Sequence, residues 1–212
     1  MSIGLNANND GSGSVQTAGN DAIVISATQN VTIPNNLTIT GTTTFSGSAT
    51  FSGGVSGNIK SGTAVASTSG TSIDFTGIPS TAKRITVMLA GVSTSGTSNL
   101  QIQLGSGSIT TSGYISSASA LAAAVASTTT TTALLIEGGS SHVATNTLSG
   151  SAILSLQSGN TWVMSASFGR DTATMVVAGG SIALSGALDR VRLTTVNGTD
   201  TFDAGSVNIL WE

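Results

Sequence analysis

Catalytic chemistry in this chain would have to depend on a single histidine, His142. The 212 residues include no cysteine, and their nine carboxylates are spread singly. A Ser-His-Asp or Cys-His catalytic arrangement would therefore need His142 as its general base. His142 lies in the segment GGSSHVA, which is typical of a solvated Gly/Ser loop. We therefore predict no catalytic residues, no enzymatic activity and no cofactor.

The carboxylates closest to each other in a turn-like segment are Asp200 and Asp203, in GTDTFDAG. Paired carboxylates can cleave glycosidic bonds across a cleft, and carboxylate oxygens can bind a hard cation. This segment instead has the composition of a turn whose Asp side chains cap their own backbone. Its oxygen ligands are too few for a calcium site, so no metal site is predicted.

Aromatic side chains could bind a carbohydrate receptor if they were exposed, and the chain offers Tyr114, Trp162 and Trp211. Trp162 alternates with Met164 at period two, which predicts a core stripe, and Trp211 alternates with Ile209 in the same way. Tyr114 follows a Ser/Thr/Gly loop. It is therefore the one candidate for a receptor contact.

Charge is scarce, at 7% of the residues against about 25% in a typical domain. The six Lys and Arg residues form no basic stripe, which argues against nucleic-acid binding. Arg190 and Arg192 share one face of an expected strand, where ion pairs with Asp189 or Glu212 are expected. The chain shows no signal-peptide pattern and no apolar stretch long enough to cross a bilayer, so we expect neither Sec export nor membrane insertion.

A four-fold hexapeptide repeat over residues 31–54 limits the function most strongly. It reads VTIPNN, LTITGT, TTFSGS and ATFSGG. Its second column is always Thr, its third is apolar, and its fifth is Asn or Gly, which adopt positive φ most easily. Each hexad is therefore expected to form a short extended piece and a tight bend. A fixed period this short is typical of a solenoid or a fibre.

Three parallel chains wound about one axis explain this repeat better than a single chain does. A three-sided solenoid uses three hexads per coil, so four hexads would have almost no stacked neighbour. In a trimer, the third column would form one apolar layer every six residues, and its axial residues are Ile33, Ile39, Phe45 and Phe51. Left-handed β-helical acyltransferases also contain hexapeptide repeats, but they need many more coils and a histidine in a cleft between subunits. A flexible linker or a β-meander would not keep the columns in phase.

The sequence divides into three parts and predicts an all-β fold. Residues 1–30, rich in Asn, Gly and Ser, are expected to be an attachment arm that orders on a partner, and residues 31–59 a short, intertwined trimeric β-shaft. Residues 60–212 alternate short apolar runs with turn clusters, which predicts a β-sandwich domain with a jelly-roll-like form. Its expected strands are 83–91, 100–104, 148–156, 161–168, 175–177, 190–196 and 206–211. Residues 116–135 mix the helix-favouring ALAAAVA with a strand-favouring Thr run, and their structure is left open.

Two segments resemble a C-terminal β domain found in bacteriophage tail fibres and other virion fibre proteins. They are SGTSIDFTGIPSTAKRITVMLAGVSTSGTSNLQIQLGSGS, residues 69–108, and LDRVRLTTVNGTDTFDAGSVNILWE, residues 188–212. The repeat resembles the shafts of such fibres as well. In that family, an N-terminal segment anchors to the particle, a trimeric shaft projects, and the C-terminal β domain faces the host. These motifs mark a fold and not a chemistry.

The resemblance implies a structural virion protein, made and assembled in the host cytoplasm. We expect a homotrimeric short tail fibre whose residues 1–30 bind a tail, baseplate or capsid protein. Its C-terminal domain would contact a host-surface glycan or protein. Head fibres and capsid cement or decoration proteins share the same motifs and are the alternative. A secreted bacterial trimeric adhesin is a third possibility, which the missing signal sequence disfavours.

Overall fold

The computed structural model describes residues 5–7, 13–15, 40–44, 59–122, 125–139, 142–171 and 173–212. By its internal contacts the chain divides into two compact units, Met1–Ser52 and Gly53–Glu212. In the first unit, β1 (Leu5–Ala7) and β2 (Gly13–Val15) pair in antiparallel orientation, and residues 40–44 form a bend with no strand. The four predicted axial residues, Ile33, Ile39, Phe45 and Phe51, lie outside the described residues.

The second unit consists of two antiparallel sheets, and its described residues contain no helix. The nine-stranded sheet has the order β10-β9-β14-β13-β12-β6-β16-β3, and β4 also pairs with β16. Its strands are β3 (Lys60–Ser61), β4 (Val65–Ala66), β6 (Arg84–Thr94), β9 (Ile115–Leu121), β10 (Ala126–Thr130), β12 (Leu148–Ser158), β13 (Thr161–Arg170), β14 (Thr174–Ala183) and β16 (Phe202–Trp211). The five-stranded sheet has the order β11-β7-β15-β5, and β8 also pairs with β7. Its strands are β5 (Ser72–Thr76), β7 (Leu100–Ser106), β8 (Ser108–Ile109), β11 (Leu134–Leu135) and β15 (Arg190–Thr195).

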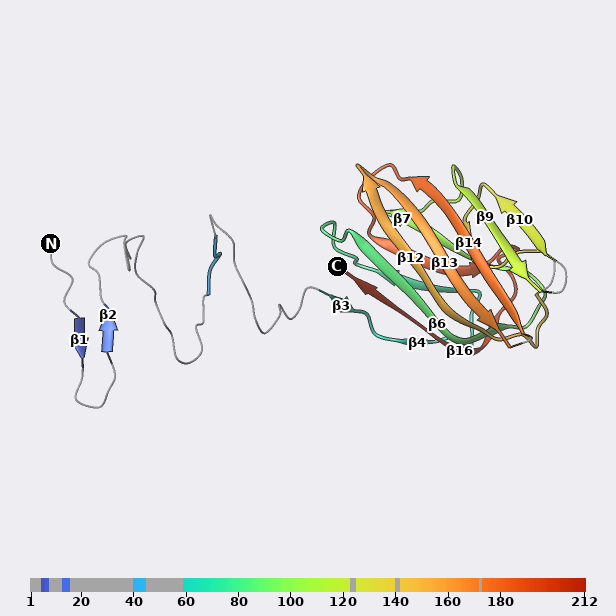
Figure 1. Ribbon diagram of the computed structural model, residues 1–212, viewed down its shortest axis with the longest axis horizontal. Coiled ribbons are helices and arrows are strands. Elements are labelled where there is room, and N and C mark those ends of the chain that lie inside the picture. The colour runs from blue at the N-terminus through green and yellow to red at the C-terminus, as the bar shows by residue number, and fades with distance from the viewer. Residues whose placement is uncertain are drawn as a thin grey trace. The chain divides into compact units, whose positions relative to one another are not determined.

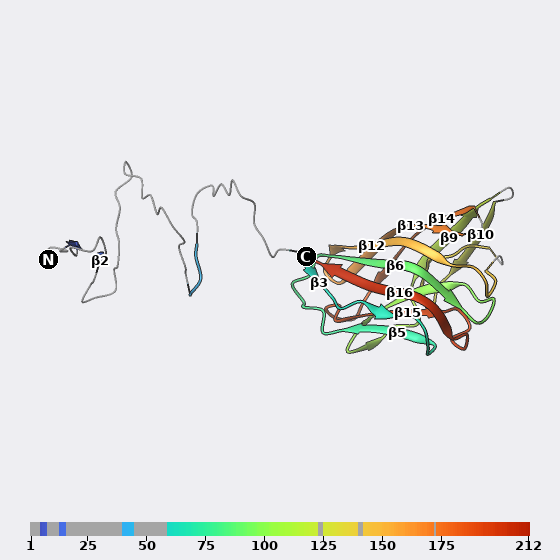
Figure 2. The same ribbon diagram turned by 90° about the horizontal axis from the view of Figure 1, so that it is seen from below.

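The two sheets lie one above the other and enclose the hydrophobic core, as Figures 1 and 2 show from two directions. Burial alternates along strands such as β5 and β13, which therefore turn every second side chain inward, whereas β7 is buried along almost its whole length. The core stripe predicted from the sequence is confirmed, since Trp162 is 2% and Met164 is 5% exposed. Trp211 is partly buried and packs against the same core. The prediction of an all-β fold is confirmed for the residues that the structure describes.

The seven expected strands overlap β6, β7, β12, β13, β14, β15 and β16. Strand β5 was not among the expected strands. The open segment 116–135 lies within the β region, because β9 and β10 pair with each other and β11 pairs with β7. Ala120 and Ala126, at the two ends of the Ala-rich run, therefore lie in antiparallel strands and are directly opposite each other. Pairing with neighbouring strands outweighs the local helix propensity of alanine here.

A glycine allows β16 to pass close to β6. Gly205 has a φ of +90°, and a Cβ at this position would lie 2.3 Å from the carbonyl oxygen of Gly91. The register of the two strands shifts between Phe202 and Ser206, as at a β-bulge. Only glycine combines this φ with so close a backbone approach.

The first strand and the last residue of the C-terminal domain lie at one end, which we call the base. Lys60 pairs with Trp211, and the Lys83 N–H donates to the Glu212 carbonyl oxygen at 2.6 Å. The opposite end carries the loops that join β6 to β7, β11 to β12, and β15 to β16 (Figure 1). We call it the loop end, and its described loop residues are 95–99, 136–139, 142–147 and 196–201.

Candidate functional site

A buried cluster of charged and polar side chains supports the loop end. Glu137 has no exposed surface, and its carboxylate accepts hydrogen bonds from the Leu100 N–H at 2.9 Å and from Arg170 Nη2 at 2.7 Å. His142 is 1% exposed, and its Nδ1 lies 3.0 Å from the same carboxylate. The other ring nitrogen of His142, Nε2, lies 3.0 Å from Thr94 Oγ1. Each polar atom of the imidazole therefore has a partner inside the domain.

The two sheets bring the members of this cluster together. Thr94 ends β6, Leu100 begins β7, and Arg170 ends β13, so three strand ends meet at the same place. The segment after β11 is held beside them, because the Ile136 N–H donates to the Leu100 carbonyl oxygen at 3.2 Å. Ile136 has no exposed surface, and the carboxylate of the next residue, Glu137, lies inside as well. The cluster thus fixes the start of the loop that connects β11 to β12.

The prediction that His142 is a solvated loop residue is wrong. Its loop folds back into the domain because a buried carboxylate must be paired and hydrogen-bonded to be tolerated. The signal in the sequence was Glu137, an isolated acid that directly follows the apolar run ALLI. An acid in that setting predicts a buried partner, and His142 and Arg170 are the basic residues that reach it.

The surroundings of Glu137 stabilise its ionised form. Burial alone raises the pKa of this carboxyl, but the hydrogen bond and charge of His142 oppose that effect. Further hydrogen bonds come from the Leu100 N–H and from Arg170. Together they hold the pKa of Glu137 below its ordinary value of 4.5. Glu137 is therefore ionised in the folded domain, and the cluster is held together by charge-assisted hydrogen bonds.

Acid is expected to destabilise the C-terminal domain below about pH 4.5. Since the folded pKa of Glu137 is lowered, its contribution to stability is present above the unfolded pKa and is lost as the pH falls through the folded pKa. The melting temperature of the native chain should therefore fall more steeply between about pH 5 and 3 than that of Glu137→Gln, which cannot titrate there. The pKa values of Asp189 and Asp200 are also lowered, but both groups are present in both proteins. Equal slopes would show that Glu137 does not carry the effect.

Beside the cluster, the loop end has an open hollow of about 530 Å³. Its wall includes Thr97, Ser98, Asn99, Thr128, Gly139 and Val196, and none of its described lining residues is charged. Asn99 Nδ2 donates to the Gly139 carbonyl oxygen at 2.6 Å, and the Gly139 N–H donates to Thr128 Oγ1 at 2.9 Å. Hydroxyl and amide groups in such a setting can form hydrogen bonds with an uncharged ligand. We regard this hollow and the loops around it as the candidate contact surface.

The two aspartates of GTDTFDAG brace the loop end. Asp200 accepts hydrogen bonds from the Ser98 N–H at 2.9 Å and from Asn197 Nδ2 at 2.7 Å, and Asp203 accepts one from Ser93 Oγ. The hydrogen bond from Asn197 is the main reason that the pKa of Asp200 is lowered. The turn is present, but the prediction that the aspartates cap their own backbone is wrong. Asn197 Oδ1 does so, by accepting from the Thr199 N–H at 3.0 Å.

Tyr114 is a core residue, so the expectation of an exposed aromatic at this position is wrong. Its side chain is 1% exposed, and its hydroxyl oxygen accepts from the Leu104 N–H at 2.8 Å and lies 2.9 Å from the Thr110 carbonyl oxygen. Burial raises the pKa of Tyr114 to about 12, although the hydrogen bond from Leu104 opposes the shift. The ring is therefore not available to stack on a receptor.

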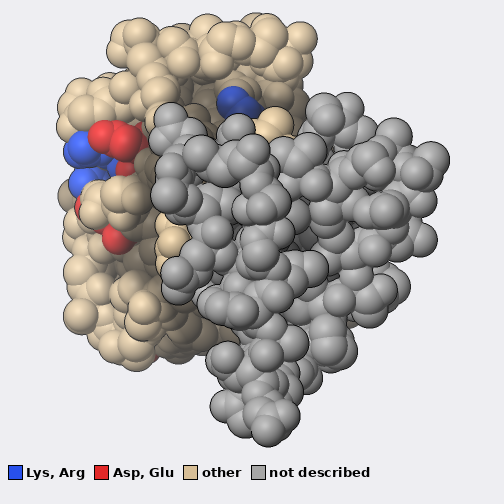
Figure 3. Space-filling view, turned by 90° about the vertical axis from the view of Figure 1, so that its left-hand side faces the viewer, with Lys and Arg blue, Asp and Glu red and all other residues tan. Residues whose placement is uncertain are grey.

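Exposed ion pairs lie on the outer side of the five-stranded sheet. Arg190 pairs with Asp189 at 2.7 Å, as predicted. Arg192 instead pairs with Asp74 of β5, through bonds of 2.7 and 2.8 Å. Glu212 pairs with Arg84 of β6, which belongs to the nine-stranded sheet. On the face of the molecule that Figure 3 shows, only a few charged side chains are visible among the described residues.

The described residues offer no obvious site for a metal ion. Across 59–122, 125–139, 142–171 and 173–212, no three His, Asp or Glu side chains lie close enough together to hold one. In the same part of the chain, there is no helix of the length and hydropathy that a bilayer crossing requires. Comparisons with protein families, with curated proteins and with solved structures gave no match.

Proposed function

We propose that this protein is a short homotrimeric fibre of a tailed bacteriophage, a structural virion protein that attaches to the particle through residues 1–30 and contacts the host surface through its C-terminal domain. The observation that carries the proposal is the hexapeptide repeat of residues 31–54, whose apolar column stays in phase over four hexads. A β domain with the family-like segments 69–108 and 188–212 follows it. These segments include strands β5 to β7, β15 and β16.

The arrangement of the C-terminal domain suits an adhesive role. Its first strand and last residue lie at the base, and its loops and the uncharged hollow lie at the opposite end. The buried Glu137 cluster gives those loops a fixed support. In the proposed fibre the loop end faces the host. Three equivalent weak contacts per fibre then produce avid capture without a deep pocket.

Two finer features of the proposal concern the fold. The intertwined trimeric shaft of residues 31–59 stays a prediction, and so does a jelly-roll-like form of the C-terminal β-sandwich. The shaft prediction depends on the four apolar layers, since four hexads bury little surface in one chain but stack three copies of each layer in a trimer. The same short shaft favours a fibre close to the particle.

Imaging of intact particles tests the location. An antibody against the C-terminal domain, with gold or fluorescent detection, should label the tail end of the virion. Label over the head would overturn the tail-fibre assignment and support a head fibre or a capsid cement protein. Particles without any label, with the protein found on bacterial surfaces, would support the secreted adhesin instead.

Deletion of residues 1–30 is expected to abolish incorporation into particles while the remaining chain still folds. The physical reason is that the arm is rich in Asn, Gly and Ser, a composition that orders on a partner and contributes little to a core of its own. Particle-associated protein should be quantified by immunoblot for the truncated and the full chain, together with the mass of each in solution. Truncated protein at full occupancy in particles would contradict the role of the arm.

A further inference from the structure

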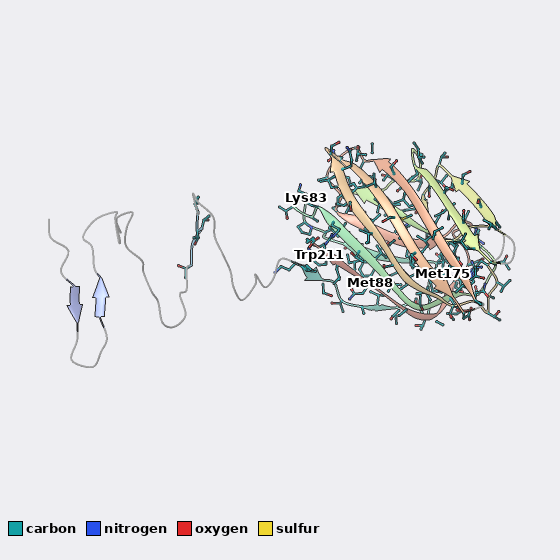
Figure 4. The ribbon with its side chains drawn as sticks, viewed as in Figure 1. Lys83, Met88, Met175 and Trp211 are labelled. Atoms are coloured by element: carbon teal, nitrogen blue, oxygen red, sulfur yellow. The ribbon has the colours of Figure 1, made fainter. Side chains whose placement is uncertain are left out.

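The outer surface of the nine-stranded sheet differs in character from that of the five-stranded sheet. Seven neighbouring strands, from β10 through β9, β14, β13, β12 and β6 to β16, present one continuous face to the outside, which we call the broad face. The pairing registers and the burial pattern identify its outward residues. They include Ser127 on β10, Ser119 on β9, Val177 on β14, Ser165 on β13, Ser151 on β12, Met88 on β6 and Asn208 on β16. Met88 and Met175 are labelled on this sheet in Figure 4.

The broad face is almost free of charge. The outward positions of its seven strands are occupied by Ser, Thr, Gly, Ala, Asn, Gln and apolar residues, with Arg84 near the base and Asp203 near the loop end as the exceptions. The outer side of the five-stranded sheet, by contrast, carries Asp74, Arg190 and Arg192. A sheet face that stays in water normally bears polar and charged side chains. The charge distribution therefore distinguishes a solvated side from a side that resembles an interface core, which is depleted of charge.

Exposed apolar side chains concentrate on the same face. Of the eleven large hydrophobic side chains that are exposed among the described residues, six lie there. They are Ile115 (74% exposed), Leu121 (42%), Ile153 (39%), Val163 (38%), Met175 (48%) and Val177 (41%). Met175 and Leu121 lie directly opposite each other on adjacent strands. Apolar residues gathered in this way on one face mark an interaction surface more often than scattered ones do.

The size of the broad face is sufficient for a stable protein interface. Seven strands at a spacing of about 4.8 Å, each with roughly nine residues at about 3.3 Å per residue, cover on the order of 1,000 Å². A standard interface needs about 800 Å² from each partner. Even partial coverage by a neighbouring domain would therefore contribute to assembly.

We propose that a second copy of this chain packs against the broad face, so that the C-terminal domains of the fibre contact one another directly. This inference rests on the proposed trimer, in which the shaft would hold three C-terminal domains at a local concentration on the order of millimolar. Such a sparsely charged face suits a copy of the same sparsely charged domain, since contact between the two would remove few charged groups from water. A nucleic acid or an anionic membrane would require a cluster of basic side chains, and Arg84 alone does not form one on this face.

Thiol labelling of the full chain tests this inference, because the native sequence contains no cysteine. Ser165→Cys places a nearly isosteric thiol at an exposed position in the middle of the broad face. Thr76→Cys, on the outward side of β5, is the matched control on the five-stranded sheet. In the assembled protein, we expect Cys-specific maleimide to label the Ser165→Cys variant at least about ten-fold more slowly than Thr76→Cys, since labelling must wait for the domains to separate. Both should react equally fast in denaturant.

The mass of the same samples separates this inference from the proposed function. A trimer with a protected thiol at position 165 supports both. A trimer in which both thiols react equally fast overturns the covered face and leaves the fibre proposal intact. A monomer with fast labelling overturns the trimer as well. A monomer with a protected thiol would mean that the same chain covers its own face, and it would overturn the assignment to a second copy.

A second position guards against a local effect of the substitution. Val177→Cys lies on the neighbouring strand β14, again on the broad face and 41% exposed in the native residue. It should show the same slow labelling as Ser165→Cys. Protection at one of the two positions only would contradict a face that is covered as a whole.

Discussion

Replacing Glu137 by Gln is expected to lower the free energy of unfolding of the C-terminal domain by about 3–5 kcal/mol. The carboxylate has no exposed surface and accepts hydrogen bonds from Arg170, His142 and the Leu100 N–H. Glutamine keeps the shape of the side chain but removes the negative charge that faces the guanidinium of Arg170, which is 2% exposed in its side chain. Breaking a buried ion pair is costly because the remaining charge stays in a medium of low dielectric constant.

The matched control is Asp74→Asn, which removes an ion pair at the surface. Asp74 and Arg192 are joined by two short hydrogen bonds, but their side chains are 38% and 35% exposed. Water and salt screen such a pair, so its loss should cost less than about 1 kcal/mol. Urea denaturation of both variants, followed by tryptophan fluorescence, measures the two losses. Equal losses would show that the buried cluster does not stabilise the loop end as we describe.

Replacing Phe45 and Phe51 together by Ser is expected to dissociate the trimer. In the proposed shaft, each position contributes three rings to an axial layer, so the double substitution removes six buried aromatic side chains. Burial of one such side chain stabilises by about 1.5–3 kcal/mol, so the six together account for on the order of 10 kcal/mol of trimer stability. In a sedimentation-velocity experiment, the sedimentation coefficient should fall from that of a trimer to that of a monomer.

The matched control for the shaft is Ser46→Ala with Ser52→Ala, in the column that directly follows the phenylalanines. The hexapeptide pattern does not place this column on the axis, so the control should stay a trimer with an unchanged melting temperature. A normal trimer in the phenylalanine variant would refute the axial assignment of Phe45 and Phe51. Loss of the trimer in both variants would point to a general disruption of the repeat instead.

The sequence predicted much of the C-terminal domain because its strands carry a clear period of two. TWVMSASF has buried Trp162, Met164 and Phe168 on one face, and the strand lies where the pattern placed it. The Ala-rich segment before Thr128 could not be assigned from local propensity. Its conformation depends on β14, which is more than fifty residues away in sequence and pairs with β9. Strand β5 was missed because its apolar residues, Ile73 and Phe75, form only a short alternating run.

The loop end was harder to predict, because it depends on contacts between distant loops. A Gly/Ser context indicated a solvated His142, but the residue is buried against Glu137. Tyr114 followed a polar loop, yet its hydroxyl group bonds to the backbone of β7. In both cases, a side chain that the local sequence indicated to be exposed forms hydrogen bonds with a buried polar group. The isolated acid Glu137, directly after an apolar run, is a local signal for the first of these contacts, and the sequence around Tyr114 holds no such signal for the second.

The native mass of the full, unmodified chain tests the central claim most directly. Sedimentation equilibrium at micromolar concentration should report about 62 kDa, the mass of three chains of 20.8 kDa, without a concentration-dependent monomer. That result would support the shaft assigned to residues 31–59. A single species of 20.8 kDa would contradict the trimeric fibre, because four hexads in one chain cannot stack enough layers to stabilise themselves.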